Sequence, residues 1–360
     1  LSVEVRGKAI RLDARGNVAR PLEAAGFDVS YALRGPDIDA LLPLQGAWSL
    51  AGHYADRPGR HVFDALKVTL GGSDIGGRIV LHQGGSRPRL VASLDSNRLH
   101  ADELVPEPAG QNAAGDGLDQ PLDIDGLAAI DLDIELRVRH LEGLAKPVQD
   151  ILLTAKAGRQ NLALTPARAT VEGVQLDVRA ELPWGDRLTA LGRDGIRVRQ
   201  LLQHTDVALR ANAPPGKLRH EIALMGHQVN LELARVEAVA PPGKALELSA
   251  SARLEDTPVE VSLQAASLAE LLQRPEGPWQ DLALDIRGGD IHLQASGRVD
   301  RPFAVKGFDI RYALQGDEIE TLLPLFNFVL PLEGVYSLTG HFADLPDRTV
   351  FDQLKISTGQ

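Results

Sequence analysis

The sequence has no cysteine, and this absence excludes a disulfide framework and any thiolate metal site. Aromatic residues are scarce as well: they make up 4% of the chain, although 44% of its residues are hydrophobic. The apolar residues are therefore mostly Leu, Val, Ile and Ala. No apolar run approaches the ~18 residues needed to cross a membrane as a helix, and no signal peptide is recognisable.

Positive charge is also in short supply, with 38 Lys and Arg against 49 Asp and Glu and a formal net charge of −11. A nucleic-acid partner requires basic patches on the protein surface. We therefore expect no nucleic-acid binding.

The sequence of the first 71 residues is repeated near the C-terminus of the chain. Residues 1–7 and 26–33 return as 282–288 and 307–314, and half of the pairs over positions 1–44 are identical at a constant shift of 281 residues. Seven extra residues then enter the second copy, after which residues 46–71 match 334–359 at a shift of 288. Such a repeat indicates a molecule built by addition of like units. Because the chain begins without Met and stops inside the second copy, we expect a piece of a longer protein.

Within the repeated stretch, residues 10–15 and 27–34 alternate between apolar and polar side chains, which is the period of a strand with one apolar face. Glycines recur every nine or ten residues, at the spacing of hairpin turns. Residues 37–43 place acids before apolar residues and a proline, which predicts a short helical cap. Residues 267–272 predict a second cap, with Ser267 as N-cap and Glu270 three residues later.

The rest of the chain reads as further strands. These are expected at residues 63–70, 78–81, 89–94, 130–139, 151–157, 160–164, 167–171, 174–182, 218–224, 229–236, 246–254 and 259–265. Residues 71–77 are expected to form a glycine-rich corner, and residues 196–202 a strand or a short helix. We divide the chain into a first repeat unit (1–102), a flexible loop (103–121), a middle segment (122–281) and a truncated second copy of the first unit (282–360).

About twenty strands without a long helix predict a mostly β fold, namely an elongated, curved antiparallel β-sheet that forms an open hydrophobic groove with a few short helices. Strands ~4.8 Å apart would make a ribbon on the order of 100 Å long. Closed barrels usually show evenly sized hairpins, and a sandwich needs a core with bulky aromatics. A filled pair of β-sheets would still produce much of the same alternation, so it stays as an alternative.

Several motifs taken in order resemble the AsmA-like family. They are Pro21 with residues 26–29, residues 35–42, 48–50 and 73–77, residues 87–90, Leu94, Ser96, Leu99 and Asp102, then residues 132–136 and 162–166, and finally residues 325–334 with Leu330 and Pro331. Each motif is degenerate, and only their order and number are specific. The likeness covers nearly the whole chain.

The resemblance implies a repeating β-groove of the kind found in bridge-like lipid transfer proteins. It implies a periplasmic protein, anchored to the inner membrane of a Gram-negative bacterium, that carries phospholipid towards the outer membrane. The family's anchoring helix is not in this sequence, so contact with the membrane would run through segments outside it. The lipid, the direction of transport and any envelope protein partners stay open.

No catalytic constellation, cofactor site or metal site emerges from the residues. His53, His61, His82 and His100 fall in one region but not at a tight metal-binding spacing. Ser73 and Asp74 lack a neighbouring His or a nucleophile elbow, and an Asx-type turn explains them better. The acids Asp131, Asp133 and Glu135 alternate with aliphatic residues, which is typical of the solvated face of a strand. We therefore expect a protein that is not an enzyme.

The leading hypothesis is a groove that binds phospholipids or other lipids by their acyl chains. A non-directional apolar lining binds each position alike, so a lipid can slide along it. The runner-up is a scaffolding β-protein of outer-membrane biogenesis with a filled core, and a hydrolase or carbohydrate-active protein is a distant third. The predicted groove lining is Ile10, Leu12, Phe27, Val29, Tyr31, Leu33, Ile130, Leu132, Ile134, Leu136, Val138, Ile291, Leu293, Phe308, Ile310, Tyr312 and Leu314.

Overall fold

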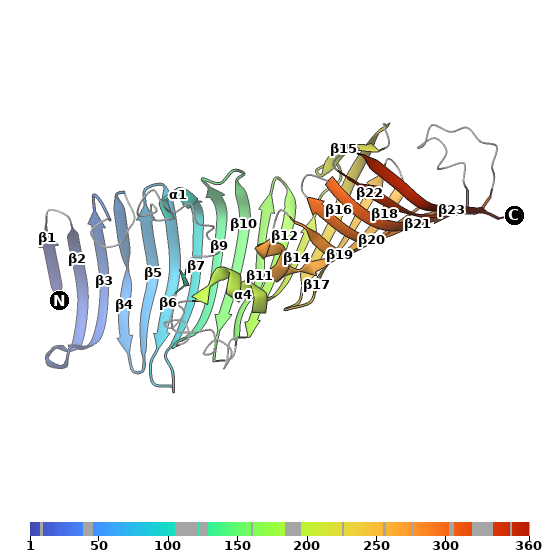
Figure 1. Ribbon diagram of the computed structural model, residues 1–360. Helices are drawn as coiled ribbons and strands as arrows, with labels where there is room; N and C mark the ends of the chain where they lie inside the picture. Colours follow the sequence, from blue (N-terminus) through green and yellow to red (C-terminus); the bar gives the residue numbers. More distant parts are fainter. Residues whose placement is uncertain are drawn as a thin grey trace. The chain divides into compact units, whose positions relative to one another are not determined.

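A computed structural model gives the fold of the chain (Figure 1). It describes residues 1–359 except 8–9, 39–45, 105–120, 123–128, 160, 184–195, 225–226, 255–256, 275–276, 302–305, 319–333 and 346–347. The chain divides into two compact units, residues 1–201 (unit 1) and 202–360 (unit 2). The predicted mostly β fold, built on an unclosed antiparallel sheet with short helices, is confirmed.

Unit 1 carries eleven strands in one layer, side by side in Figure 1. The strands are β1 (Ser2–Arg6), β2 (Arg11–Arg20), β3 (Ala25–Gly35), β4 (Trp48–Arg57), β5 (Arg60–Leu70), β6 (Ser73–His82), β7 (Arg89–His100), β9 (Asp131–Glu142), β10 (Val148–Ala157), β11 (Asn161–Val171) and β12 (Val174–Pro183). Each pairs with the next in that order. A separate two-stranded sheet joins β8 (Pro121–Leu122) to β13 (Ile196–Arg197).

In the described part of unit 1, three short helical segments accompany these strands. A single 3₁₀ turn, η1 (Pro21–Glu23), links β2 to β3, and α1 (Ala101–Leu104) follows β7. The third segment is α4 (Val198–His204), and the division between the two units falls within it. Residues 196–202, predicted as a strand or a short helix, are therefore helical from Val198 onwards.

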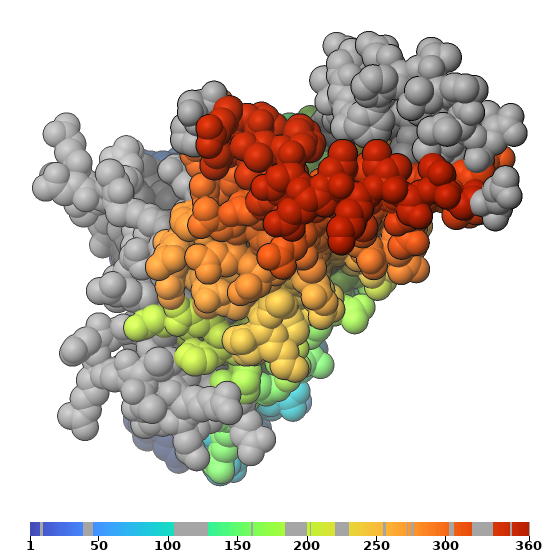
Figure 2. Space-filling view, turned by 45° about the vertical axis from the view of Figure 1, so that its right-hand side comes forward, coloured from blue at the N-terminus to red at the C-terminus, as the bar shows by residue number. Residues whose placement is uncertain are grey.

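The described residues of unit 2 form ten strands and one further helix, α5 (Leu268–Gln273). The strands are β14 (Asp206–Asn212), β15 (Arg219–Leu224), β16 (His227–Ala240), β17 (Ala245–Leu254), β18 (Thr257–Ser267), β19 (Trp279–Gly288), β20 (Ile291–Arg301), β21 (Lys306–Gly316), β22 (Tyr336–Asp344) and β23 (Thr349–Thr358). Both β14 and β15 pair with β16, and from β16 to β23 each strand pairs with the next. Figure 2 shows β23, in red, at the surface along one edge of this unit.

One pairing departs from the predicted antiparallel order. Strands β7 and β9 lie parallel, with Leu90 opposite Leu132 and Leu94 opposite Leu136. A parallel neighbour needs a crossover, and residues 101–130 provide the connection. The predicted loop at residues 103–121 lies within this connection, although residues 105–120 are outside the described part.

Three local expectations were wrong or incomplete. The glycine-rich corner predicted at residues 71–77 is a two-residue turn, because β6 already begins at Ser73. The strands predicted at 160–164 and 167–171 are a single strand, β11, with a register shift between Leu164 and Ala167. Of the helical cap predicted at residues 37–43, only the first two residues lie in the described part. The cap predicted at residues 267–272 is confirmed as α5, with a capping box between Ser267 and Glu270.

Each sheet is a single layer, and this leaves much of its apolar side near solvent. Among the described residues only Tyr336 is a large side chain with less than 2% of its surface exposed. The hydrophobic clusters that do form are small and lie near strand ends.

Candidate functional site: the apolar face

The side chains of each unit divide between two faces of its sheet. We call the face that carries Phe27, Val29, Tyr31 and Leu33 in unit 1, and Phe308, Ile310, Tyr312 and Leu314 in unit 2, the apolar face. The opposite side is the polar face. Alternation along each strand produces this division, and the cross-strand register keeps it in step from one strand to the next.

In unit 1 the apolar face contains an unbroken row of apolar or glycine residues across ten consecutive paired strands. Every member is the direct cross-strand partner of the next. The row is Gly16, Val29, Tyr54, Phe63, Ile79, Ala92, Ile134, Ala155, Leu164 and Ala180. At ~4.8 Å per strand it runs about 43 Å across the sheet.

A second row in unit 1 runs parallel to the first. It consists of Leu66, Gly77, Leu94, Leu136, Leu153, Ala167 and Val178. Two neighbouring rows of this kind make a continuous apolar strip that crosses the strands.

Unit 2 contains a comparable row across nine strands, β14 and β16 to β23. Its members are Ala211, Val236, Ala250, Val261, Ile286, Leu293, Leu314, Leu338 and Ile356. Beside it lies an apolar hollow of about 250 Å³, lined by residues such as Trp279, Leu284 and Phe308. The two units thus carry the same kind of apolar row.

The structure places the predicted lining residues on this apolar face. Leu12, Phe27 and Leu33 lie on β2 and β3, and their copies on β20 and β21 repeat the arrangement. Ile10 directly precedes β2 and packs against the cluster of Ile38, Trp48 and Leu70. Leu132 to Val138 alternate onto the same face of β9, and Ile130 stands directly before that strand.

Sequence reasoning left the aromatic residues of the later strands out of the lining. Every aromatic side chain that the structure describes lies on the apolar face: Phe27, Tyr31, Trp48, Tyr54, Phe63, Trp279, Phe308, Tyr312, Tyr336, Phe342 and Phe351. Rings on neighbouring strands touch, with centroids 5.0 Å apart for Tyr54 and Phe63 and for Phe342 and Phe351. The alternation of Trp48, Leu50 and Tyr54 in the sequence is the signal that points to them.

Most of the apolar face is only half-buried, and burial increases towards the strand ends. Trp48 and Leu70 are buried against Ile38, and the Trp48 Nε1–H donates to the carbonyl oxygen of Asp37 at 3.0 Å. At the opposite ends of β10 and β12, Ala157 and Leu182 are buried against Leu201 of α4. Most members of the strip, by contrast, keep part of their surface accessible, although Val29, Leu66 and Ala92 are buried.

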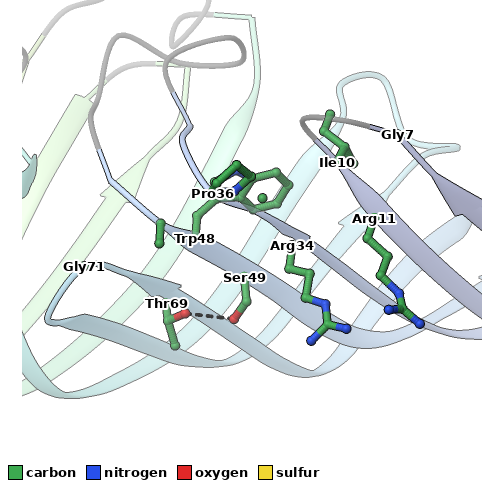
Figure 3. Close-up of a pocket in the computed structure, with 11 residues that line it drawn as sticks. Gly7, Ile10, Arg11, Arg34, Pro36, Trp48, Ser49, Thr69 and Gly71 are labelled. Carbon is green, nitrogen blue, oxygen red and sulfur yellow. Dashed lines mark hydrogen bonds between the residues drawn. The ribbon is translucent and has the colours of Figure 1, made fainter.

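Figure 3 shows the division of faces at the Trp48 end of unit 1. Ile10 and Trp48 lie on one side of the sheet, whereas Arg34, Ser49 and Thr69 point to the other. Ser49 and Thr69 share a hydrogen bond of 2.8 Å between their hydroxyl groups. The surrounding cavity has a volume of about 520 Å³.

The polar face carries ion pairs between neighbouring segments of the sheet. Asp64 pairs with Arg78 at 2.6 Å, Asp133 with Arg89 at 3.0 Å, and Asp131 with Arg87 at 3.4 Å. The acids Asp131, Asp133 and Glu135 therefore stand beside arginines on the solvated face, as their alternation predicts.

The segment after β7 is fixed by Glu103 of α1. Its carboxylate accepts hydrogen bonds from the backbone of Gly72 and from both the backbone and the hydroxyl group of Ser73, the last at 2.6 Å. Burial raises the pKa of Glu103, but these hydrogen bonds and the nearby His100 outweigh it, so that the pKa lies below its usual range. The Ser73 hydroxyl is thereby engaged in a structural contact.

Asp74 does not make the Asx-type turn predicted for it. Its carboxylate reaches across to β7 and accepts from the backbone N–H groups of Asn97 and Arg98, the latter at 2.7 Å. Burial raises the pKa of Asp74, yet these bonds hold it below the usual value. This carboxylate fixes the end of β7.

Three of the four candidate histidines lie beside a polar side chain. His53 lies 2.8 Å from Asp28, His61 2.8 Å from the Tyr54 hydroxyl, and His100 3.8 Å from Glu142. Within the described ranges, no group of three His, Cys, Asp or Glu is placed to hold a metal ion.

In the part of the chain that the structure covers, no helix has the length and apolarity to span a bilayer. Comparisons of the chain with protein-family models, with curated proteins and with solved structures found no match.

Proposed function

We propose that this protein binds lipids by their acyl chains, phospholipids foremost, along the apolar face and conducts them across successive strands. The observation that carries the proposal is the unbroken apolar row across ten strands of unit 1, matched by the nine-strand row of unit 2. Burying apolar surface contributes about 25 cal/mol per Å², without directional demands. A lipid on such a strip meets similar side chains at every strand and can slide along it.

The half-buried state of the strip favours an open groove over a scaffold with a filled core. In a filled core, large side chains are packed to the density of a crystal and lose nearly all their exposure. Among the described large side chains only Tyr336 is less than 2% exposed, and the other buried ones, such as Trp48 and Leu182, form small clusters. Charged groups on the polar face are in place to keep the other side of the sheet in water.

The resemblance to the AsmA-like family supports the same function and supplies a setting. In that setting the protein is not an enzyme, is anchored to the inner membrane through segments outside this sequence, and stands in the periplasm. It would pass phospholipids between the inner and outer membranes of a Gram-negative envelope.

Two substitutions at adjacent positions of β9 test the proposal. Leu136→Asp places a carboxylate in the second row of the strip, whereas Arg137→Asp places the same side chain on the exposed polar face. Binding of a fluorescent acyl-chain phospholipid should fall at least ten-fold in Leu136→Asp and by less than two-fold in Arg137→Asp. Equal binding by the two folded variants would contradict an acyl-binding strip and favour the scaffold.

A further inference from the structure

A third row on the apolar face of unit 1 is interrupted by polar residues. From Leu81 of β6 the row continues through Leu90, Leu132, Ala157, Leu162 and Leu182 without a polar member. On β4 and β5, however, the same row holds Asp56 and His61, which are direct cross-strand partners. Polar groups in an apolar wall are unfavourable unless they find partners.

These residues belong to a hydrogen-bonded chain at the hairpin ends of β4 to β6. The Tyr54 hydroxyl lies 2.8 Å from His61 Nδ1, and His61 Nε2 lies 3.2 Å from Gln83 Oε1. The Gln83 amide oxygen can only accept a hydrogen bond, so His61 donates to it from Nε2. His61 Nδ1 is then the acceptor, and the Tyr54 hydroxyl group donates a hydrogen bond to it. Asp56 Oδ1 is 3.6 Å from His61 Nδ1, while Asp56 Oδ2 accepts from the backbone N–H of Gly26.

The second copy of the repeat shows that the fold does not need Tyr54 and His61. The corresponding residues, at the shift of 288, are Phe342 and Thr349, and they stand in the same register on β22 and β23. Asp344 matches Asp56 and caps Gly307 as Asp56 caps Gly26, at 2.9 Å and 2.8 Å. Both copies thus share the capping carboxylate of Asp56 or Asp344. The Tyr54 phenol and the His61 imidazole occur only in the first copy.

We propose that Tyr54, His61 and Asp56 form a contact site for the primary ammonium headgroup of a lipid whose acyl chains lie on the apolar face. The inference rests on the proposed function. The first copy would then have a polar headgroup site beside the strip, whereas the matching position of the second copy would have none.

The chemistry of the site selects a cationic donor. With the donors of Tyr54 and His61 engaged, the site presents the lone pairs of the Tyr54 oxygen and the Asp56 carboxylate. A primary ammonium can donate to both, and it is attracted by the neighbouring rings of Phe27 and Phe63. Burial and the charge of Asp56 raise the pKa of Tyr54, so the phenol keeps its proton.

The test uses an equimolar mixture of dioleoyl phosphatidylethanolamine, phosphatidylcholine and phosphatidylglycerol, with bound lipid identified by native mass spectrometry. The wild-type chain should enrich phosphatidylethanolamine over phosphatidylcholine by about five-fold, the effect of one net hydrogen bond. The double variant Tyr54→Phe/His61→Thr installs the residues of the second copy and should bring this ratio close to one. The control Ser49→Ala/Thr69→Ala removes a hydrogen bond of 2.8 Å on the polar face and should leave the ratio of the two bound lipids unchanged.

Three results would overturn the site. They are equal binding of the two lipids by the wild-type chain, an enrichment that survives in the double variant, and a preference for the hydroxyl-bearing phosphatidylglycerol. If the wild-type chain and both variants bound no lipid at all, the proposed function would fail, and the headgroup site with it. Total lipid binding that persists while the enrichment is absent would reject the site alone.

Discussion

The ring of Tyr31 on β3 lies over Gly52, its direct cross-strand partner on β4. A Cβ atom added to Gly52 would stand 2.9 Å from the Tyr31 hydroxyl oxygen. The second copy repeats the pair, with Tyr312 over Gly340 at 2.6 Å. In each copy the tyrosine ring covers backbone that the glycine on the neighbouring strand leaves exposed. This burial raises the pKa of both tyrosines.

Removing the Tyr31 ring should destabilise unit 1. Tyr31→Ala is expected to lower the free energy of unfolding by about 1–3 kcal/mol, because a half-buried ring is lost and Gly52 is uncovered. Tyr31→Phe keeps the ring and should change the free energy of unfolding by less than ~1 kcal/mol. Urea denaturation followed by circular dichroism measures both, and equal losses in the two variants would contradict a role for the ring.

Gly16 should tolerate no side chain. A Cβ at this position would lie 2.1 Å from the backbone oxygen of Asp28 and 2.6 Å from the Val29 Cα, and neither backbone atom can move aside. Gly16→Ala is expected to cost about 2–4 kcal/mol of stability by overpacking. Gly158→Ala is the control, because a Cβ there meets nothing within 4 Å. Similar urea midpoints for the two variants would show that the close approach at Gly16 is absent in solution.

Glu103 should hold α1 to the turn between β5 and β6. Glu103→Ala leaves the backbone N–H groups of Gly72 and Ser73 without their carboxylate partner, with an expected loss of about 1–3 kcal/mol. Hydrogen exchange at residues 71–73 and 101–104 should quicken. The neighbouring Asp102→Ala serves as control, and unchanged exchange in Glu103→Ala would argue against the clamp.

His341 should make the stability of unit 2 dependent on pH. Its ring lies between Asp309 of β21 and Asp352 of β23, at 2.7 and 2.8 Å, and the hydrogen bonds to these carboxylates raise its pKa. The contribution of the imidazolium is therefore complete below the ordinary histidine pKa of ~6.5 and is lost as pH rises through the raised value.

The corresponding variant is His341→Gln. It should lower the urea midpoint at pH 5 clearly more than at pH 9, whereas His140→Gln, at an exposed position of β9, should show no such difference. An effect of His341→Gln that is equal at both pH values would contradict the charged bridge.

The sequence predicts much of this fold because its two strongest signals, alternation and repetition, are local. Alternation from Leu132 to Val138 assigns each side chain of β9 to the correct face. The shift between the copies predicts that β20 and β21 repeat β2 and β3, and the register of both pairs agrees. The bulge between Phe63 and Leu66, with Ala65 at φ 49°, is not part of the predicted strand at residues 63–70, and it recurs at Gln353 with φ 53°.

Other features depend on contacts between distant segments and leave no local signal. The parallel pairing of β7 with β9 follows from a crossover whose sequence has no regular alternation and is rich in glycine and proline. The partners of Asp74 and Glu103 lie 22 to 31 residues away, so local turn chemistry predicts the wrong hydrogen-bond donors for Asp74. The hydrogen-bonded chain of Tyr54, His61 and Gln83 likewise requires three strands in register.

The central claim, that the apolar face carries acyl chains, is tested most directly by native mass spectrometry of the purified chain followed by extraction and identification of its lipids. The claim predicts several co-purified phospholipids per chain, lost in Leu136→Asp and kept in Arg137→Asp. A bare protein mass with no extractable lipid, from a chain that is folded by circular dichroism, would contradict it.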